Sequence, residues 1–180
     1  MILYVARLEP DKRPHWLLDR MPEIARRLPQ HDLVVAGRGP LGAALELRPA
    51  QLGMAKRVHF VGWRADVPGL LASADLLVLT SSSGGMPNVI LEAMASTRPV
   101  VANEVHGALE HLGVEHDGQF TPANDPQAFV DAVVRIGGDD NLAHRLGQRN
   151  RSRAREVFSI DRTVGSYATL YDTLLAAKIR

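Results

Sequence analysis

The sequence predicts an α/β fold: a single Rossmann-like domain in which a parallel sheet is flanked by helices and the C-terminal part is helical. Two observations lead to this class. Short β-rich runs alternate with segments of helical length, and repeated β-α units form parallel sheets that are covered on both faces. From Asp125 onward, apolar residues recur at helical spacing. The chain has 180 residues, enough for one well-buried core, so we expect one domain over residues 1–180.

The expected strands are short apolar runs, rich in Val, Leu and Ile, between helix-length segments. They are residues 2–5, 32–36, 58–61, 76–79 and 100–102. Pro22 lies inside the first helical pattern and predicts a kink or an early break there. Pro126 is placed to start a helix, and residues 163–178 form the final helical pattern.

The loops that follow the strands define the expected ligand cleft. In open parallel sheets, ligands bind beyond the carboxyl ends of the strands. The loops that would gather there are residues 6–13, 37–40, 62–64 and 80–87.

Composition excludes several classes of protein. The charge is nearly balanced, with 21 Lys and Arg against 20 Asp and Glu, which does not indicate a nucleic-acid binder. No apolar run approaches the ~20 residues of a membrane span, and the first residues lack the features of a signal peptide, so we expect a cytoplasmic location and no transmembrane segment. The absence of cysteine excludes disulfides and thiolate nucleophiles.

The stretch from Ser81 to Ala95 is the most informative motif. It follows an apolar strand and opens an amphipathic helix, with the turn Gly84-Gly85-Met86-Pro87 between them. Such a junction directs unpaired backbone N–H groups and the positive end of a helix dipole at one point, which suits a phosphate. Glu92 lies further along the same helix, where its carboxylate could accept hydrogen bonds from sugar hydroxyls.

Two cations flank the turn that follows the first strand. Arg7 and Lys12 could both reach a diphosphate at the strand end, where the arginine would clamp two oxygens and the lysine would act as a mobile charge. The alternative interpretation, that they are solvent-exposed loop charges, stays open.

Gly37, Gly39 and Gly42 satisfy the dinucleotide pattern G-x-G-x-x-G. The pattern follows the second strand instead of the first, and no acidic residue ends the next strand, which disfavours an NAD-dependent oxidoreductase. We expect these glycines to form a tight turn that lets the helix pack closely and leaves space for a ligand.

Two other clusters have ordinary interpretations. The arginines from Arg145 to Arg155 cover a broad arc of a helix, which favours a solvated face over a nucleic-acid site. His106, His111 and His116 recur every five residues, a step of about 140° on a helix that scatters them, so we expect no metal site. The sequence contains no G-x-S-x-G elbow, which excludes a serine hydrolase of that kind.

These motifs resemble the C-terminal, nucleotide-sugar-binding domain of the family 4 (group 1) retaining glycosyltransferases, which have the two-domain GT-B fold. The resemblance covers nearly the whole chain. It runs through residues 5–8 with Lys12, then 34–40, 61–63, 75–81, 85–95 and 99–102.

The resemblance implies a donor site for a UDP- or GDP-sugar that needs neither a cofactor nor a metal. The residues expected to bind the diphosphate are Arg7, Lys12, Gly85, Met86 and Pro87. The base is expected against Gly62, Trp63 and Arg64, the ribose against Glu92, and the rest of the cleft against Gly37, Gly39, Gly84 and Asn88.

Two departures from the family pattern bear on activity. The family has two glutamates separated by seven residues, and counting back from Glu92 places the first of them at position 84, which is glycine here. The N-terminal acceptor domain of the family is also absent from the 180 residues. The resemblance therefore predicts nucleotide binding, with a domain that is inactive alone.

Two functions stay open on this basis. One is the donor-binding domain of a retaining glycosyltransferase, and the other is a non-catalytic nucleotide-sugar-binding module. In the family, the final helix would reach toward the acceptor domain, so we expect exposed apolar surface that favours a partner chain or self-association.

Overall fold

The computed structural model describes residues 1–82, 87–104, 108–113 and 116–178. Its centre is one sheet of six parallel strands in the order β3-β2-β1-β4-β5-β6. The strands are β1 (Ile2–Val5), β2 (Leu33–Ala36), β3 (Val58–Gly62), β4 (Leu76–Leu79), β5 (Val100–Asn103) and β6 (Phe120–Thr121). The strand order reverses direction between β1 and β4, so the crevice beyond the carboxyl ends of these strands is the expected ligand position.

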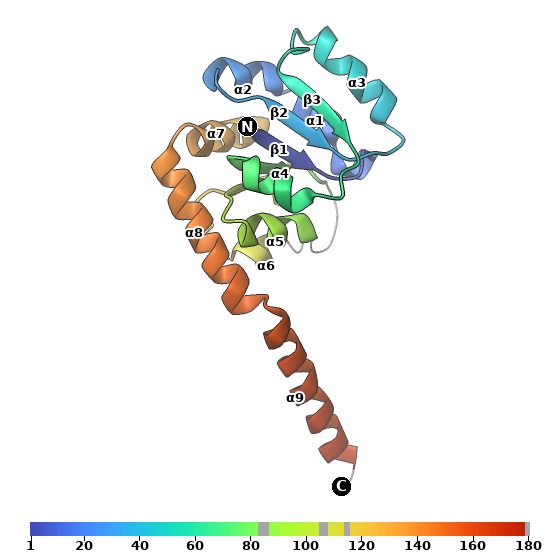
Figure 1. Cartoon of the computed structure of the whole chain (residues 1–180), viewed down its shortest axis with the longest axis vertical. Helices are drawn as coiled ribbons and strands as arrows, with labels where there is room; N and C mark the ends of the chain where they lie inside the picture. Colours follow the sequence, from blue (N-terminus) through green and yellow to red (C-terminus); the bar gives the residue numbers. More distant parts are fainter. Residues whose placement is uncertain (83–86, 105–107, 114–115, 179–180) are drawn as a thin grey trace.

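Helices cover both faces of the sheet (Figure 1). One face carries α1 (Pro14–Leu18), α2 (Met21–Arg27), α3 (Gly42–Gln51) and α7 (Pro126–Gly137). The other face carries α4 (Val67–Ser73), α5 (Asn88–Ala95) and α6 (Ala108–Leu112). The helix α8 (Asp140–Val157) runs from α7 along the edge and contacts α5 and α6 as well.

The alternation of side chains along each strand produces two cores. In β1, Ile2 and Tyr4 join the core under α1, α2 and α7, whereas Leu3 joins the core under α4 and α5. All three side chains are at most 1% exposed. Strands buried on both faces give continuous apolar runs, which is why the sequence pattern located them.

The predicted fold class is confirmed, and so are five strands, to within one residue at their ends. The break expected near Pro22 is also confirmed: α1 ends at Leu18, and α2 begins at Met21 with the proline in its first turn. Pro126 starts α7, where the Asp125 carboxylate accepts a hydrogen bond from the backbone N–H of Ala128 at 2.9 Å. The two-residue strand β6 was not predicted.

The last helix, α9 (Ile160–Lys178), projects away from the rest of the molecule (Figure 1). Residues 160–176 are all exposed. Seven of them are large and apolar: Ile160, Val164, Tyr167, Leu170, Tyr171, Leu174 and Leu175. The expectation that the final helix exposes apolar surface is therefore confirmed. None of the helices within the described ranges combines the length and the apolar character that a membrane crossing needs.

Candidate functional site

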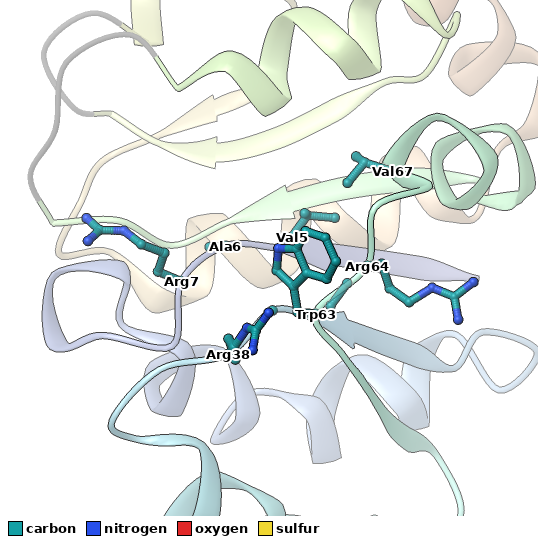
Figure 2. A pocket seen from close by; sticks show the side chains of 9 residues that line it. Val5, Ala6, Arg7, Arg38, Trp63, Arg64 and Val67 are labelled. Carbon is teal, nitrogen blue, oxygen red and sulfur yellow. The ribbon is translucent and has the colours of Figure 1, made fainter.

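A pocket of about 420 Å³ lies beyond the carboxyl ends of β1, β2 and β3 (Figure 2). Its lining comes from the last residues of β1 and β2, from the loops that follow the three strands, and from the first residue of α4. The lining residues are Val5, Ala6, Arg7, Ala36, Gly37, Arg38, Trp63, Arg64 and Val67. Three of the four predicted loops therefore meet at one cavity.

The pocket combines an apolar surface with cations. Val5, Ala36 and Val67 form apolar parts of the lining. Trp63 is 60% exposed, and the Arg38 guanidinium lies 5.2 Å from the centroid of its ring, within the range of a cation–π contact. An apolar, partly aromatic wall beside positive charge suits a planar base that carries a phosphate.

Arg7 is the first cation at this edge of the sheet. Its Nη1 lies 2.9 Å from Glu9 Oε1, and its side chain is 69% exposed. An exposed ion pair contributes about 0–1 kcal/mol, so the pair holds Arg7 only weakly. An incoming phosphate could therefore replace Glu9 at little cost.

Lys12 lies near the pocket in sequence but does not line it. Its Nζ is 2.9 Å from Asp11 Oδ2. The hydrogen bond from Lys12 holds the pKa of the Asp11 carboxyl below its ordinary value. Lys12 and Asp11 therefore form a charged pair at the surface of the turn that follows β1.

Buried hydroxyl groups fix the backbone of that turn. The Tyr4 hydroxyl donates to the carbonyl oxygen of Lys12 at 3.0 Å, and Thr80 Oγ1 lies 2.9 Å from the same oxygen. The backbone N–H of Ser82 donates to the Asp11 carbonyl at 2.8 Å. These contacts join the loop after β1 to the loop after β4, across the point where the strand order reverses.

The environment of Tyr4 keeps its hydroxyl neutral. Burial raises the pKa of Tyr4 well above its ordinary value, because the phenolate would lose its hydration. A neutral phenol remains a hydrogen-bond donor to the Lys12 carbonyl. Sequence reasoning missed Tyr4 and Thr80, although each stands at or beside the end of a predicted strand.

Gly37 and Gly39 allow neighbouring loops to approach closely. A Cβ at Gly37 would lie 1.9 Å from the carbonyl oxygen of Ala6, and one at Gly39 would lie 2.5 Å from that of Leu8. Gly37 also has φ of +146°, which side chains rarely permit. The backbone N–H of Gly37 donates to the Gly62 carbonyl at 2.7 Å, so this turn is tied to the loops on both sides.

The other predicted residues have different places. Pro87 precedes α5 and Asn88 begins it, and Glu92 lies on α5 with an exposed side chain. Neither these three nor Gly39 and Gly62 line the pocket. Gly84, Gly85 and Met86 lie outside the described residues.

Arg38 and Val67 are lining residues that sequence reasoning did not select. A signal for Arg38 was present, because it stands between the two glycines of the turn after β2.

The arginine-rich helix α8 is solvated only in part. Arg145, Arg151 and Arg155 are exposed. Arg149 Nη1 binds Asp117 Oδ2 at 2.6 Å, and Arg153 donates to the backbone carbonyl oxygen of His111. Two of the arginines thus fasten α8 to the segments beside it.

The doubly wound sheet with a pocket at its carboxyl edge defines an architecture that commonly carries nucleotide sites. The chain belongs to the group 1 glycosyl transferases, since the sequence model of that family matches residues 1–139. Its fold matches the C-terminal domain of a GT-B glycosyltransferase.

Similarity to individual proteins extends over nearly the whole chain. The chain is 29% identical to the UDP-Gal:alpha-D-GlcNAc-diphosphoundecaprenol alpha-1,3-galactosyltransferase of Escherichia coli, over 97% of this chain and 46% of that protein. The crystal structure of Anabaena HepE in complex with UDP matches with a TM-score of 0.85 and 28% identity, over 96% of this chain and 48% of HepE.

A third match is with a structure of similar size. The C-terminal domain of the group 1 glycosyl transferase LpcC from Francisella tularensis has a TM-score of 0.79 and 21% identity, over 88% of this chain and 86% of that domain. At this identity the likeness concerns the fold alone. The chain spans about half the length of the curated relatives it matches.

Proposed function

We propose that this chain is the donor-binding domain of a retaining glycosyltransferase, which binds a UDP- or GDP-sugar for transfer to an acceptor held elsewhere. The observation that carries the proposal is the pocket beyond β1, β2 and β3, which has an aromatic wall at Trp63 and a weakly held cation at Arg7. The UDP complex of HepE, a protein 28% identical to this chain, supports the choice of ligand.

The parts of the donor have distinct positions in this proposal. The base lies in the apolar part of the pocket, against Trp63 and the backbone of Arg64, and reaches Gly62 beyond the lining. The diphosphate lies toward Arg7 and Lys12. The ribose hydroxyls bind the carboxylate of Glu92, which the exposed face of α5 presents to solvent.

Two cations of the site can stabilise the charge that develops during sugar transfer. Negative charge builds on a nucleotide diphosphate as the sugar departs, and positioned cations stabilise that charge. Arg7 and Lys12 stand on a turn that Tyr4, Thr80 and Ser82 fasten in place. A fixed turn lowers the reorganisation that would otherwise accompany binding.

A non-catalytic binding module is the second candidate function. Position 84 is glycine, which offers no carboxylate at the place where the family pattern has its first glutamate. Gly84→Glu separates the two functions. If the rest of the site is built for transfer, this variant binds the nucleotide sugar more tightly while its affinity for the bare nucleotide stays constant. If Gly84→Glu leaves the affinity for the nucleotide sugar unchanged, the result contradicts a transfer site in which only this carboxylate is missing.

We further propose that the apolar face of α9 docks onto a second domain, the one that holds the acceptor. The relatives are about twice as long as this chain, which supports a second domain over a surface that nothing in the described structure covers. Self-association of the chain is the alternative occupant of this face.

Calorimetric titration with UDP, GDP, ADP and NAD, followed by the corresponding nucleotide sugars, tests the proposed ligand. We expect a nucleoside diphosphate to bind, and Arg7→Ala and Lys12→Ala each to weaken it roughly tenfold or more, because each removes a charge-assisted contact. Arg26→Ala, an exposed arginine on α2, is the matched control and should leave affinity unchanged. Binding of NAD alone, or of no nucleotide, would contradict the proposal.

A further inference from the structure

Arg38 is a pocket cation that differs from its two neighbours in its contacts. Arg7 pairs with Glu9, and Arg64 binds Asp66 through two hydrogen bonds of 2.8 Å. Among the residues that the structure describes, Arg38 has no carboxylate partner, and its guanidinium lies 5.2 Å from the centre of the Trp63 ring. Its hydrogen-bond donors are therefore available to a ligand.

The backbone around Arg38 is held from two sides. The carbonyl oxygen of Arg38 accepts a hydrogen bond from the Leu8 N–H at 3.0 Å, and the preceding Gly37 donates to Gly62. Gly37 and Gly39, on either side of Arg38, leave no room for a Cβ. These contacts restrain the turn, and the Arg38 guanidinium lies beside the indole.

The arrangement separates Arg38 from the expected phosphate position. Figure 2 shows Arg7 extending away from Trp63 on the far side of Ala6, whereas Arg38 lies next to the indole. Val5 and Val67 are apolar residues of the same pocket lining. Arg38 thus stands at the apolar end of the pocket, where a base would lie.

Guanidinium chemistry then constrains which base fits. An arginine offers five N–H donors and no acceptor. Uracil presents carbonyl oxygens and guanine presents O6 beside N7, all of which accept such donors, whereas adenine presents N7 beside an amino group that is itself a donor. An arginine beside a stacked base therefore favours a base with a carbonyl edge.

We propose that Arg38 and Trp63 together select the base of the nucleotide: the base stacks on the Trp63 wall, and the Arg38 guanidinium donates to a carbonyl oxygen on the edge of the base. The inference rests on the proposed function and deepens it. It makes Arg38 a specificity-determining residue and defines the ligand class as uracil or guanine nucleotides, with adenine nucleotides rejected.

The test measures the affinities of UDP, GDP and ADP for the unmodified chain and for Arg38→Ala, Arg38→Lys and the control Arg26→Ala. The unmodified chain should bind UDP or GDP at least roughly tenfold more tightly than ADP, the discrimination typical of a good arginine–base contact. Arg38→Ala should bring the ratio to within about threefold by weakening the preferred nucleotide alone. Arg38→Lys keeps the charge but loses the planar fork, so its ratio should fall between the two.

Three results would overturn the inference, and they identify different failures. Equal weakening of UDP, GDP and ADP by Arg38→Ala would show that Arg38 acts on the phosphates. Unchanged affinities for all three nucleotides would show that Arg38 contacts no part of the ligand. If no diphosphate binds the unmodified chain, the proposed function itself fails. Because Arg38 is exposed, its variants should keep the thermal midpoint of the unmodified chain, and a melting curve checks this.

Discussion

At the scale of single residues, Gly37 leaves the least room for a side chain among the glycines that the structure describes. A Cβ there would overlap the Ala6 carbonyl oxygen at 1.9 Å, and φ is +146°. Gly37→Ala should therefore lower the free energy of unfolding by about 3 kcal/mol or more, since backbone strain and overpacking add. Urea denaturation measures this.

The matched control for Gly37 is Gly165 in α9, where an added Cβ meets nothing within 4 Å. Gly165→Ala should leave stability unchanged or raise it by up to ~1 kcal/mol, because alanine is the better helix former. Equal effects of the two substitutions would contradict the close approach of the loops after β1 and β2.

Tyr4 provides a prediction about pH. Its pKa is raised in the folded protein, so the folded state holds the phenolic proton more tightly than the unfolded chain, in which tyrosine titrates near ~10. The raised pKa of Tyr4 therefore contributes to the free energy of unfolding, and this contribution is complete below that pH. The free energy of unfolding declines as pH rises above it, with a slope of up to ~1.4 kcal/mol per pH unit.

Tyr4→Phe isolates this contribution. The variant should lose about 1 kcal/mol at neutral pH, because the Lys12 carbonyl loses a donor, and its stability should decline less steeply above pH ~10. Unfolding curves of the two proteins at matched pH values provide the comparison. Parallel pH profiles would contradict a buried neutral phenol.

The sequence located part of the candidate site. Arg7 and the loop of residues 62–64 were selected because strand ends in a parallel sheet meet at one edge. The family resemblance then singled out Trp63 and Arg64, and the structure brings these two and Arg7 to one pocket. Arg38 was missed because its contact with Trp63 joins loops that are far apart in the chain. The hydroxyl groups of Tyr4 and Thr80 were missed for a different reason: their partner is a backbone carbonyl, which no pattern of side chains reveals.

At the scale of elements, burial patterns explain what was predictable. Strands covered on both faces appear as apolar runs in the sequence. The strand β6 has two residues, too few to show such a run, and the side chain of Gln119, just before it, links it to neighbouring elements. Gln119 Oε1 accepts hydrogen bonds from the Val100 N–H at 2.9 Å and from Asn150 Nδ2 at 2.8 Å. This buried network joins β5, the start of β6 and α8, and only the folded chain assembles it.

Helices α8 and α9 are consecutive in the sequence but differ in how deeply their apolar side chains are buried. Leu146 on α8 is 2% exposed, whereas Leu174 on α9 is 57% exposed. Leu146→Ala should destabilise the protein by about 2–5 kcal/mol through a cavity, and Leu174→Ala should change stability by less than ~0.5 kcal/mol. Thermal or urea unfolding compares them. Similar losses for both would show that α9 packs against the body of the protein.

At the scale of the whole molecule, the large apolar side chains of α9 form a surface that nothing in the described part of the chain covers. If it docks onto a second domain, light scattering of the isolated chain should give a mass near that of one copy, 19.7 kDa. A dye that reports exposed apolar surface should bind, and Tyr171→Gln with Leu174→Gln should reduce that binding. A stable dimer that these substitutions dissociate would instead assign the face to a second copy.

The central claim is that a nucleotide binds in the pocket at Trp63, and the two tryptophans of the chain make a direct measurement available. Trp16 is 8% exposed in the core beside Phe129, whereas Trp63 lines the pocket. Their indole N–H groups give two resonances in a ¹H–¹⁵N spectrum, and Trp63→Phe identifies each.

Titration with UDP or GDP should move the Trp63 resonance to saturation and leave that of Trp16 in place. A saturating shift confined to Trp16, or no shift of either resonance at millimolar nucleotide, would contradict binding at this pocket.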